Sequence, residues 1–189
     1  MDAKKLFQRA LEEATGVIAS VEPTHFKRNT PCSDWSCRQL VNHMLSELAW
    51  VPDLLAGKTV GEVGDRYDGD LIKEDLHGTW HILAYKAMTA VHNVDPDATI
   101  HLSYADVTAG HYIQEIGGDL LLHAWDTDQS LYCSLIFDKV VAQTLYESIL
   151  PRVEEFTASG LFAKPVSTTS DRVQAKLLGL VGRREPETV

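Results

Sequence analysis

Residues 117–126 read Gly-Gly-Asp-Leu-Leu-Leu-His-Ala-Trp-Asp, an apolar run that carries a carboxylate and an imidazole four residues apart. On a helix, this spacing puts Asp119 and His123 on one face, about 6 Å apart along the axis. Polar side chains on a face that should be buried need hydrogen-bond partners or a bound ion. Two interpretations therefore stay open: the pair is satisfied inside the core, or it holds a metal.

Outside this run, apolar residues recur every three or four positions over long segments, which predicts an all-α protein. We expect four long helices, a fifth that begins at Asp138 and is bent by Pro151, and a short final helix after Asp171. The four long helices are predicted over residues 2–20, 36–57, 70–91 and 109–128, and residues 99–104 are predicted to be extended. We see no repeat and no linker, so residues 1–189 are expected to form one domain.

The second predicted helix has an explicit start. Ser36 and Gln39 form a capping box, and Trp35 just before the cap is placed for a hydrophobic staple. Gly117 and Gly118 lower the helix propensity of the fourth helix by about 1 kcal/mol each. Close approach of another helix or of a ligand would compensate for this cost.

Composition and motifs limit the classes of partner and function that we expect. A net charge of -10 argues against nucleic acid or an anionic membrane as a partner. The three cysteines form no CxxC pair, which fits a reducing, cytoplasmic setting. Cys32 and Cys37 are expected to be small buried apolar residues. We expect neither a signal peptide nor a membrane span. The absence of GxSxG, P-loop and Rossmann motifs leaves hydrolase, NTPase and dinucleotide-binding functions without support.

A metal at Asp119 and His123 needs a third ligand from another helix. His43 is the best candidate, because it flanks the apolar stripe of the second helix. Two histidines and one carboxylate would leave coordination positions open, as catalytic sites do. Glu47 and Asp126 each lie about one turn from a histidine, so each is a candidate acceptor for an imidazole N–H.

A rival pair, His77 and His81, has the i, i+4 spacing of metal-binding histidines. It lies among Lys73, Glu74 and Gly78, which is typical of a solvated flank. We therefore expect His77 and His81 to be surface residues.

Three segments resemble a known family. Residues 31–44 read PCSDWSCRQLVNHM, residues 119–126 read DLLLHAWD and residues 177–183 read LLGLVGR. Together they resemble the actinobacterial branch of the DinB-like metal-binding superfamily, in particular the N-terminal domain of mycothiol-dependent maleylpyruvate isomerase. The resemblance implies an up-down-down-up four-helix bundle, here with a short extra C-terminal helix. It also implies a divalent metal held by His43, Asp119 and His123.

The chain also departs from the isomerase pattern. The isomerase carries glutamate where this chain has Asp119, and it has a further C-terminal domain that residues 1–189 are expected to lack. We therefore do not expect this chain to catalyse the isomerisation itself. The oligomeric state stays open, and a homodimer is one alternative that the resemblance suggests.

The sequence supports three hypotheses. The first is a metal-dependent transferase or isomerase-like enzyme that joins a low-molecular-weight thiol, such as mycothiol, to a small electrophilic substrate. Zinc is the default metal, with nickel or iron as alternatives. The second is a non-catalytic metal- or ligand-binding protein, for example a stress-response module. The third is a bundle whose polar pair is structural.

Overall fold

The computed structural model describes residues 1–186 and divides them into two compact units. One unit comprises residues 2–134, and the other comprises Met1 together with residues 135–186. The structure is mostly helical, as predicted. The expectation of a single domain stays a prediction.

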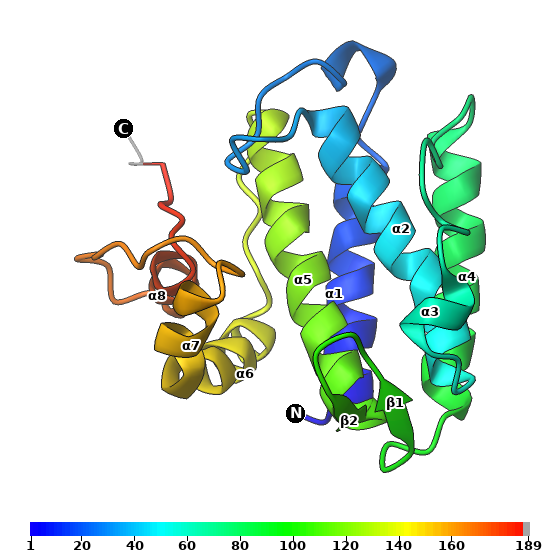
Figure 1. The fold of residues 1–189 in the computed structure, drawn as a ribbon. Coiled ribbons are helices and arrows are strands. Elements are labelled where there is room, and N and C mark those ends of the chain that lie inside the picture. The colour runs from blue at the N-terminus through cyan, green and yellow to red at the C-terminus, as the bar shows by residue number, and fades with distance from the viewer. Residues whose placement is uncertain (187–189) are drawn as a thin grey trace. The chain divides into compact units, whose positions relative to one another are not determined.

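The first unit is a bundle of four long helices. They run up, down, down and up in Figure 1, which is the predicted topology. Their bounds are α1 (Ala3–Ile18), α2 (Cys37–Leu55), α4 (Leu76–Asn93) and α5 (Ala109–Ser130).

A side chain caps the N-terminus of each of these helices. Ser36 caps α2 by accepting from the Gln39 N–H, and the Gln39 side chain accepts from the Ser36 N–H, so the predicted capping box is confirmed. Asp2 caps α1 and Thr108 caps α5, each by accepting from the backbone N–H three residues further on. Capping fixes the first residue of α2 and α5, and thereby which positions along each helix share a face.

The predicted start of the third long helix at Asp70 is wrong, because α4 begins at Leu76. The Asn42 side chain donates to the Gly69 carbonyl at 2.8 Å and accepts from the Leu71 N–H at 2.7 Å. These bonds hold the segment before α4 against α2, and Asp75 then caps α4 through the Gly78 N–H at 2.9 Å.

Short elements occupy parts of the predicted loops. They are η1 (Pro23–His25), α3 (Val60–Val63) and the antiparallel pair β1 (Thr99–His101) and β2 (Asp106–Thr108). The hairpin agrees with the extended segment that the sequence predicts at residues 99–104.

A close approach of α1 explains why a glycine stands at position 117 despite its low helix propensity. A Cβ atom at Gly117 would lie 2.5 Å from Leu6 Cδ2 and 3.2 Å from the Phe7 Cα of α1. Leu6 and Phe7 are fully buried. Gly117 therefore lets α1 pack directly on α5, and this packing fixes the position of the helix that carries the polar pair.

The second unit contains the end of the chain. Its elements are α6 (Lys139–Ile149), η2 (Leu150–Arg152), α7 (Val153–Ala158) and α8 (Val173–Leu180). Asp138 caps α6 as predicted, but the fifth helix is interrupted at η2, which contains Pro151. The predicted cap at Asp171 is wrong, because Arg172 occupies the N-cap position and makes no side-chain cap. The fifth helix that we expected corresponds to α6, η2 and α7, and the short final helix corresponds to α8.

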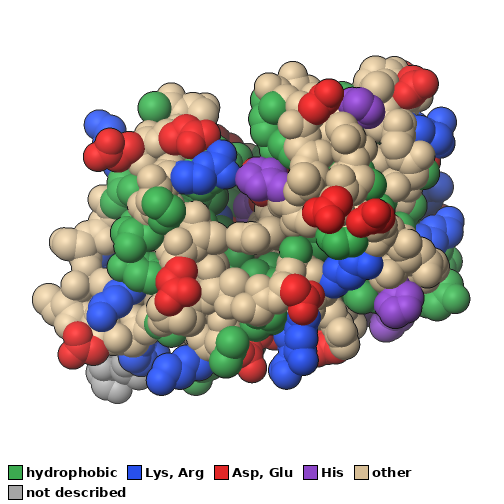
Figure 2. Space-filling view, turned by 90° about the horizontal axis from the view of Figure 1, so that it is seen from below, with side chains coloured by type: hydrophobic (Ala, Val, Ile, Leu, Met, Phe, Trp, Pro, Cys, Tyr) green, Lys and Arg blue, Asp and Glu red, His purple; other side chains and the backbone are tan. Residues whose placement is uncertain are grey.

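Within the described residues 1–186, no helix is long and apolar enough to cross a membrane. On the face drawn in Figure 2, Lys and Arg side chains are interspersed with Asp and Glu.

Candidate metal centre

Helix α5 carries three of the polar residues that the sequence singles out. Asp119, His123 and Asp126 follow one another at intervals of four and three, so they lie on one face of the helix. The face is turned inward, since His123 is 9% exposed and Asp126 is fully buried.

Helix α2 brings the fourth residue, His43, to this face. It packs beside α5 (Figure 1). His43 Nε2 lies 3.6 Å from Asp119 Oδ2, and His123 Nε2 lies 3.2 Å from Asp119 Oδ1. The two imidazole centroids are 5.1 Å apart and their planes are perpendicular. One donor atom from each of His43, Asp119 and His123 lies within 4.8 Å of the others.

Asp119 is the central residue of this cluster. Its Oδ2 atom is buried and has no hydrogen-bond partner among the described residues, because the contact with His43 is too long. A buried carboxylate oxygen without a partner is costly, so it indicates a place where a cation or a water belongs.

Charge is balanced inside the cluster by the imidazoles. Burial by itself would lower the pKa of His123, but the charge of Asp119 and hydrogen bonds to neighbours outweigh burial and raise that pKa to about 12. Burial by itself would raise the pKa of Asp119, yet the two imidazoles hold it well below its usual range. Asp119 and the two imidazoles thus stabilise each other's ionised forms.

Asp126 orients His123 from the other side of the ring. Its Oδ2 lies 3.1 Å from His123 Nδ1, which leaves Nε2 directed at Asp119. This is the arrangement of a metal-binding histidine held by a carboxylate. Glu47 is less well placed for the same role, because its Oε1 lies 3.9 Å from His43 Nδ1.

Cys32 also lies at the centre, although the sequence suggested only a small buried residue. The thiol is half-buried, 3.2 Å from Asp126 Oδ2 and 3.9 Å from His123 Nδ1. Cys32, His123 and Asp126 form a second group whose donor atoms lie within 4.8 Å of one another. The loop before α2 brings Cys32 there, and no spacing in the sequence signals it.

Trp35 covers the two imidazoles. Its ring centroid lies 4.7 Å from that of His43 and 5.9 Å from that of His123. The residue that the sequence suggested as a helix staple is thus part of the wall of the site. The indole thus packs against both imidazoles.

His77 and His81 are exposed on α4. They line a hollow of about 120 Å³ with Trp80, and His77 Nε2 lies 3.1 Å from the Ile18 carbonyl oxygen. Neither belongs to a group of three metal-ligand side chains among residues 1–186. Their positions agree with the predicted surface location.

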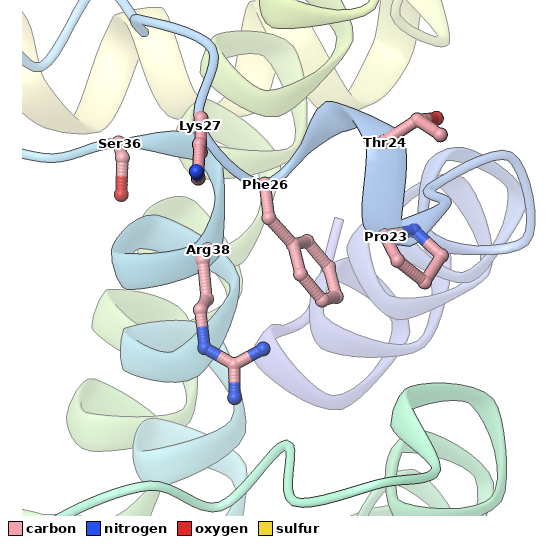
Figure 3. A pocket seen from close by; sticks show the side chains of 6 residues that line it. All are labelled: Pro23, Thr24, Phe26, Lys27, Ser36 and Arg38. Carbon is pink, nitrogen blue, oxygen red and sulfur yellow. The ribbon is translucent and has the colours of Figure 1, made fainter.

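A larger surface hollow, of about 670 Å³, lies between η1 and the start of α2 (Figure 3). The Arg38 guanidinium lies 4.9 Å from the Phe26 ring centroid in its wall, and it also forms an ion pair with Asp70 at 2.7 Å. The charge of Arg38 is thus already compensated. None of the candidate ligands lines this hollow.

The comparison with known families found one match. A family model described as the mycothiol maleylpyruvate isomerase N-terminal domain matches residues 7–128, more than half of the chain. The chain belongs to this family. The family match spans His43, Asp119, His123 and Asp126, and it ends before the second unit. Searches of curated proteins and of solved structures found no match.

Proposed function

We propose that this chain binds a divalent metal through His43, Asp119 and His123 and uses it with a low-molecular-weight thiol. The reaction would be a transfer or an isomerase-like conversion of a small electrophilic molecule. The family relationship supports a thiol of the mycothiol type. The proposal assumes a reducing, cytoplasmic compartment, in which that thiol stays reduced.

The unpartnered Asp119 Oδ2 is the observation that carries the proposal. Two ligands of a tetrahedral zinc ion, each bound at about 2.0 Å, lie about 3.3 Å apart. The distances from the Asp119 oxygens to the two histidine Nε2 atoms are 3.2 and 3.6 Å. The first distance ends at Oδ1 and the second at Oδ2, and one donor atom from each of the three residues lies within 4.8 Å of the others. Their nitrogen and oxygen donors suit zinc, with nickel and iron as alternatives.

Three protein ligands leave a position open for a further ligand. A divalent metal bound here would act as a Lewis acid and would favour the thiolate form of a thiol at neutral pH. The side chains of His43 and Asp119 are 26% and 34% exposed, so a small molecule can reach them from solvent.

Other side chains prepare the site for such a ligand. Asp126 holds His123 with its Nε2 turned toward Asp119. Trp35 limits the access of water to both imidazoles. Both side chains hold these positions before a thiol binds, so the site is preorganised.

Element analysis of protein purified without a histidine tag tests the first half of the proposal. About one equivalent of zinc, nickel or iron per chain is expected, and a chain that binds none when zinc is supplied would contradict it. The second half predicts that mycothiol raises the melting temperature of the zinc-loaded protein and leaves that of the metal-free protein unchanged. Metal binding without any thiol effect would instead favour a non-catalytic metal-binding protein.

A further inference from the structure

His123 has a carboxylate on each side of its ring. Its Nε2 lies 3.2 Å from Asp119 Oδ1, and its Nδ1 lies 3.1 Å from Asp126 Oδ2. A neutral imidazole carries its proton on one nitrogen and a lone pair on the other. Each tautomer of His123 therefore finds an acceptor for its N–H, and either ring nitrogen is able to bind a metal ion.

Cys32 completes a set of donor atoms on the Nδ1 side of this ring. Its Sγ lies 3.2 Å from Asp126 Oδ2 and 3.9 Å from His123 Nδ1. With the 3.1 Å between Asp126 Oδ2 and His123 Nδ1, these distances form a closed triangle of three atoms. Around a tetrahedral zinc ion, a sulfur ligand lies about 3.5 Å from a nitrogen or oxygen ligand, and nitrogen and oxygen lie about 3.3 Å apart. One metal ion can therefore contact all three atoms.

The two sides of the His123 ring differ in donor chemistry and in exposure. His43 and Asp119 offer nitrogen and oxygen, and their side chains are 26% and 34% exposed, which leaves access for the fourth ligand that zinc takes. The other side contains the sulfur of Cys32. There Asp126 has no exposed surface and His123 is 9% exposed, so a fourth ligand from solvent has little access. Sulfur favours soft ions such as copper(I) or cadmium.

We propose that Cys32, Asp126 and His123 Nδ1 form a second metal position that selects soft, thiophilic ions. Binding displaces the thiol proton of Cys32 to solvent and leaves the ring proton of His123 on Nε2, where Asp119 Oδ1 accepts it. One neutral imidazole offers one lone pair, so the ion at Cys32 and the zinc at His43 and Asp119 exclude each other. The inference goes beyond the proposed function, because the second position uses neither His43 nor a thiol cofactor.

Cadmium(II) is the probe for this position. Its bond to a thiolate gives an ultraviolet charge-transfer band that nitrogen and oxygen ligands do not give. Titration of the metal-free protein should develop this band up to about one cadmium per chain. In zinc-loaded protein, the band should grow as an equal amount of zinc is released, which element analysis of the desalted protein measures. A wild type that binds cadmium without the band, or that shows the band and keeps all its zinc, would overturn the proposal.

Substitutions test the three ligands one by one. Cys32→Ser should lose the band and keep its zinc. His123→Ala and Asp126→Asn should weaken cadmium binding by about tenfold or more, since the loss of a carboxylate beside a metal-bound histidine already has an effect of that size. Cys133→Ser is the matched control: it removes an exposed thiol and should leave the band unchanged. A band that depends on Cys133, or a cadmium affinity that His123→Ala leaves unchanged, would show a lone thiol at work and overturn the proposal.

His43→Ala distinguishes this inference from the proposed function. It removes a ligand of the first position only, so the variant should lose zinc and keep the cadmium band with an unchanged dissociation constant. Loss of the band in His43→Ala would show that cadmium does not bind as proposed. A wild type that binds no zinc but shows a band that depends on Cys32 would contradict the proposed function and support the second position. A wild type that binds zinc and gives no band would overturn the second position alone.

Discussion

Asp126 Oδ2 lies 3.1 Å from Nδ1 of His123, and Asp126 has no exposed surface. A fully buried carboxylate is costly unless it is paired, and its pairing here fixes the plane and the tautomer of an imidazole. The same carboxylate oxygen is 3.2 Å from the Cys32 thiol. Asp126 therefore joins the loop before α2 to the face of α5 that carries the candidate ligands.

Replacing Asp126 should weaken metal binding, although Asp126 is not one of the three proposed ligands. We expect Asp126→Asn to lower zinc affinity about 10- to 100-fold, because the imidazole loses the negative charge that orients it. Competition with a chromophoric chelator measures this change, and circular dichroism checks the fold. Glu47→Gln is the comparison variant, and its effect on zinc should be smaller, since Glu47 lies 3.9 Å from His43. A larger loss in Glu47→Gln than in Asp126→Asn would show that the wrong carboxylate has been assigned.

The two histidine pairs should behave oppositely when they are replaced. His43→Ala and His123→Ala are each expected to abolish stoichiometric zinc binding, because each removes one of the three proposed ligands. The double variant His77→Ala/His81→Ala should keep its full metal content, as its side chains are exposed on α4. Element analysis after dialysis gives the answer. Loss of metal in the double variant would place the site on α4 instead.

Because α1 packs closely on α5, we expect alanine substitutions at two glycines to change the stability of the protein in opposite directions. Gly117→Ala should destabilise the protein by about 1–2 kcal/mol, since the added Cβ meets the Phe7 backbone at 3.2 Å. Gly16→Ala, in the exposed face of α1 with nothing within 4 Å, should stabilise it by about 0.5–1 kcal/mol. Urea denaturation measures both. The two changes must differ in sign if the close approach, and not helix propensity, decides the outcome.

The contacts of Asp53, which lies outside the candidate metal site, predict that the stability of the protein depends on pH. It accepts hydrogen bonds from Lys58, Arg66 and Tyr67 at 2.6–2.8 Å. The Lys58 bond is the main cause that lowers the pKa of Asp53 below its ordinary value of 3.8. A lowered pKa means that the contribution to stability is present above pH 3.8 and is lost as the pH falls through the folded-state value.

Asp53→Asn should therefore lower stability at neutral pH and have a shrinking effect as the pH falls below about 4. Urea denaturation of both proteins between pH 3 and pH 7 tests this expectation. A difference between the two proteins that stays constant over that range would mean that the ion pairs of Asp53 contribute nothing measurable. Added salt should reduce the difference at neutral pH, because the partners are near the surface.

The sequence by itself determined the helices and the phase of the polar pair. The apolar period of 3.6 residues predicts α1, α2 and α5, and Ser36 with Gln39 defines where α2 begins. Asp119 and His123 share a face because their spacing is local to one helix. The prediction that α4 begins at Asp70 was wrong for a long-range reason. Asn42, on another helix, binds the segment that would otherwise have extended α4.

Only the tertiary structure decided which distant residues meet that pair. Cys32 and Trp35 reach the site through the loop before α2. Asp126, and not Glu47, lies within hydrogen-bond distance of an imidazole, although both have a suitable spacing in the sequence. Spacing along a helix fixes angles around its own axis, whereas contacts between helices depend on where each helix packs, and here Gly117 and the buried side chains of α1 set that position.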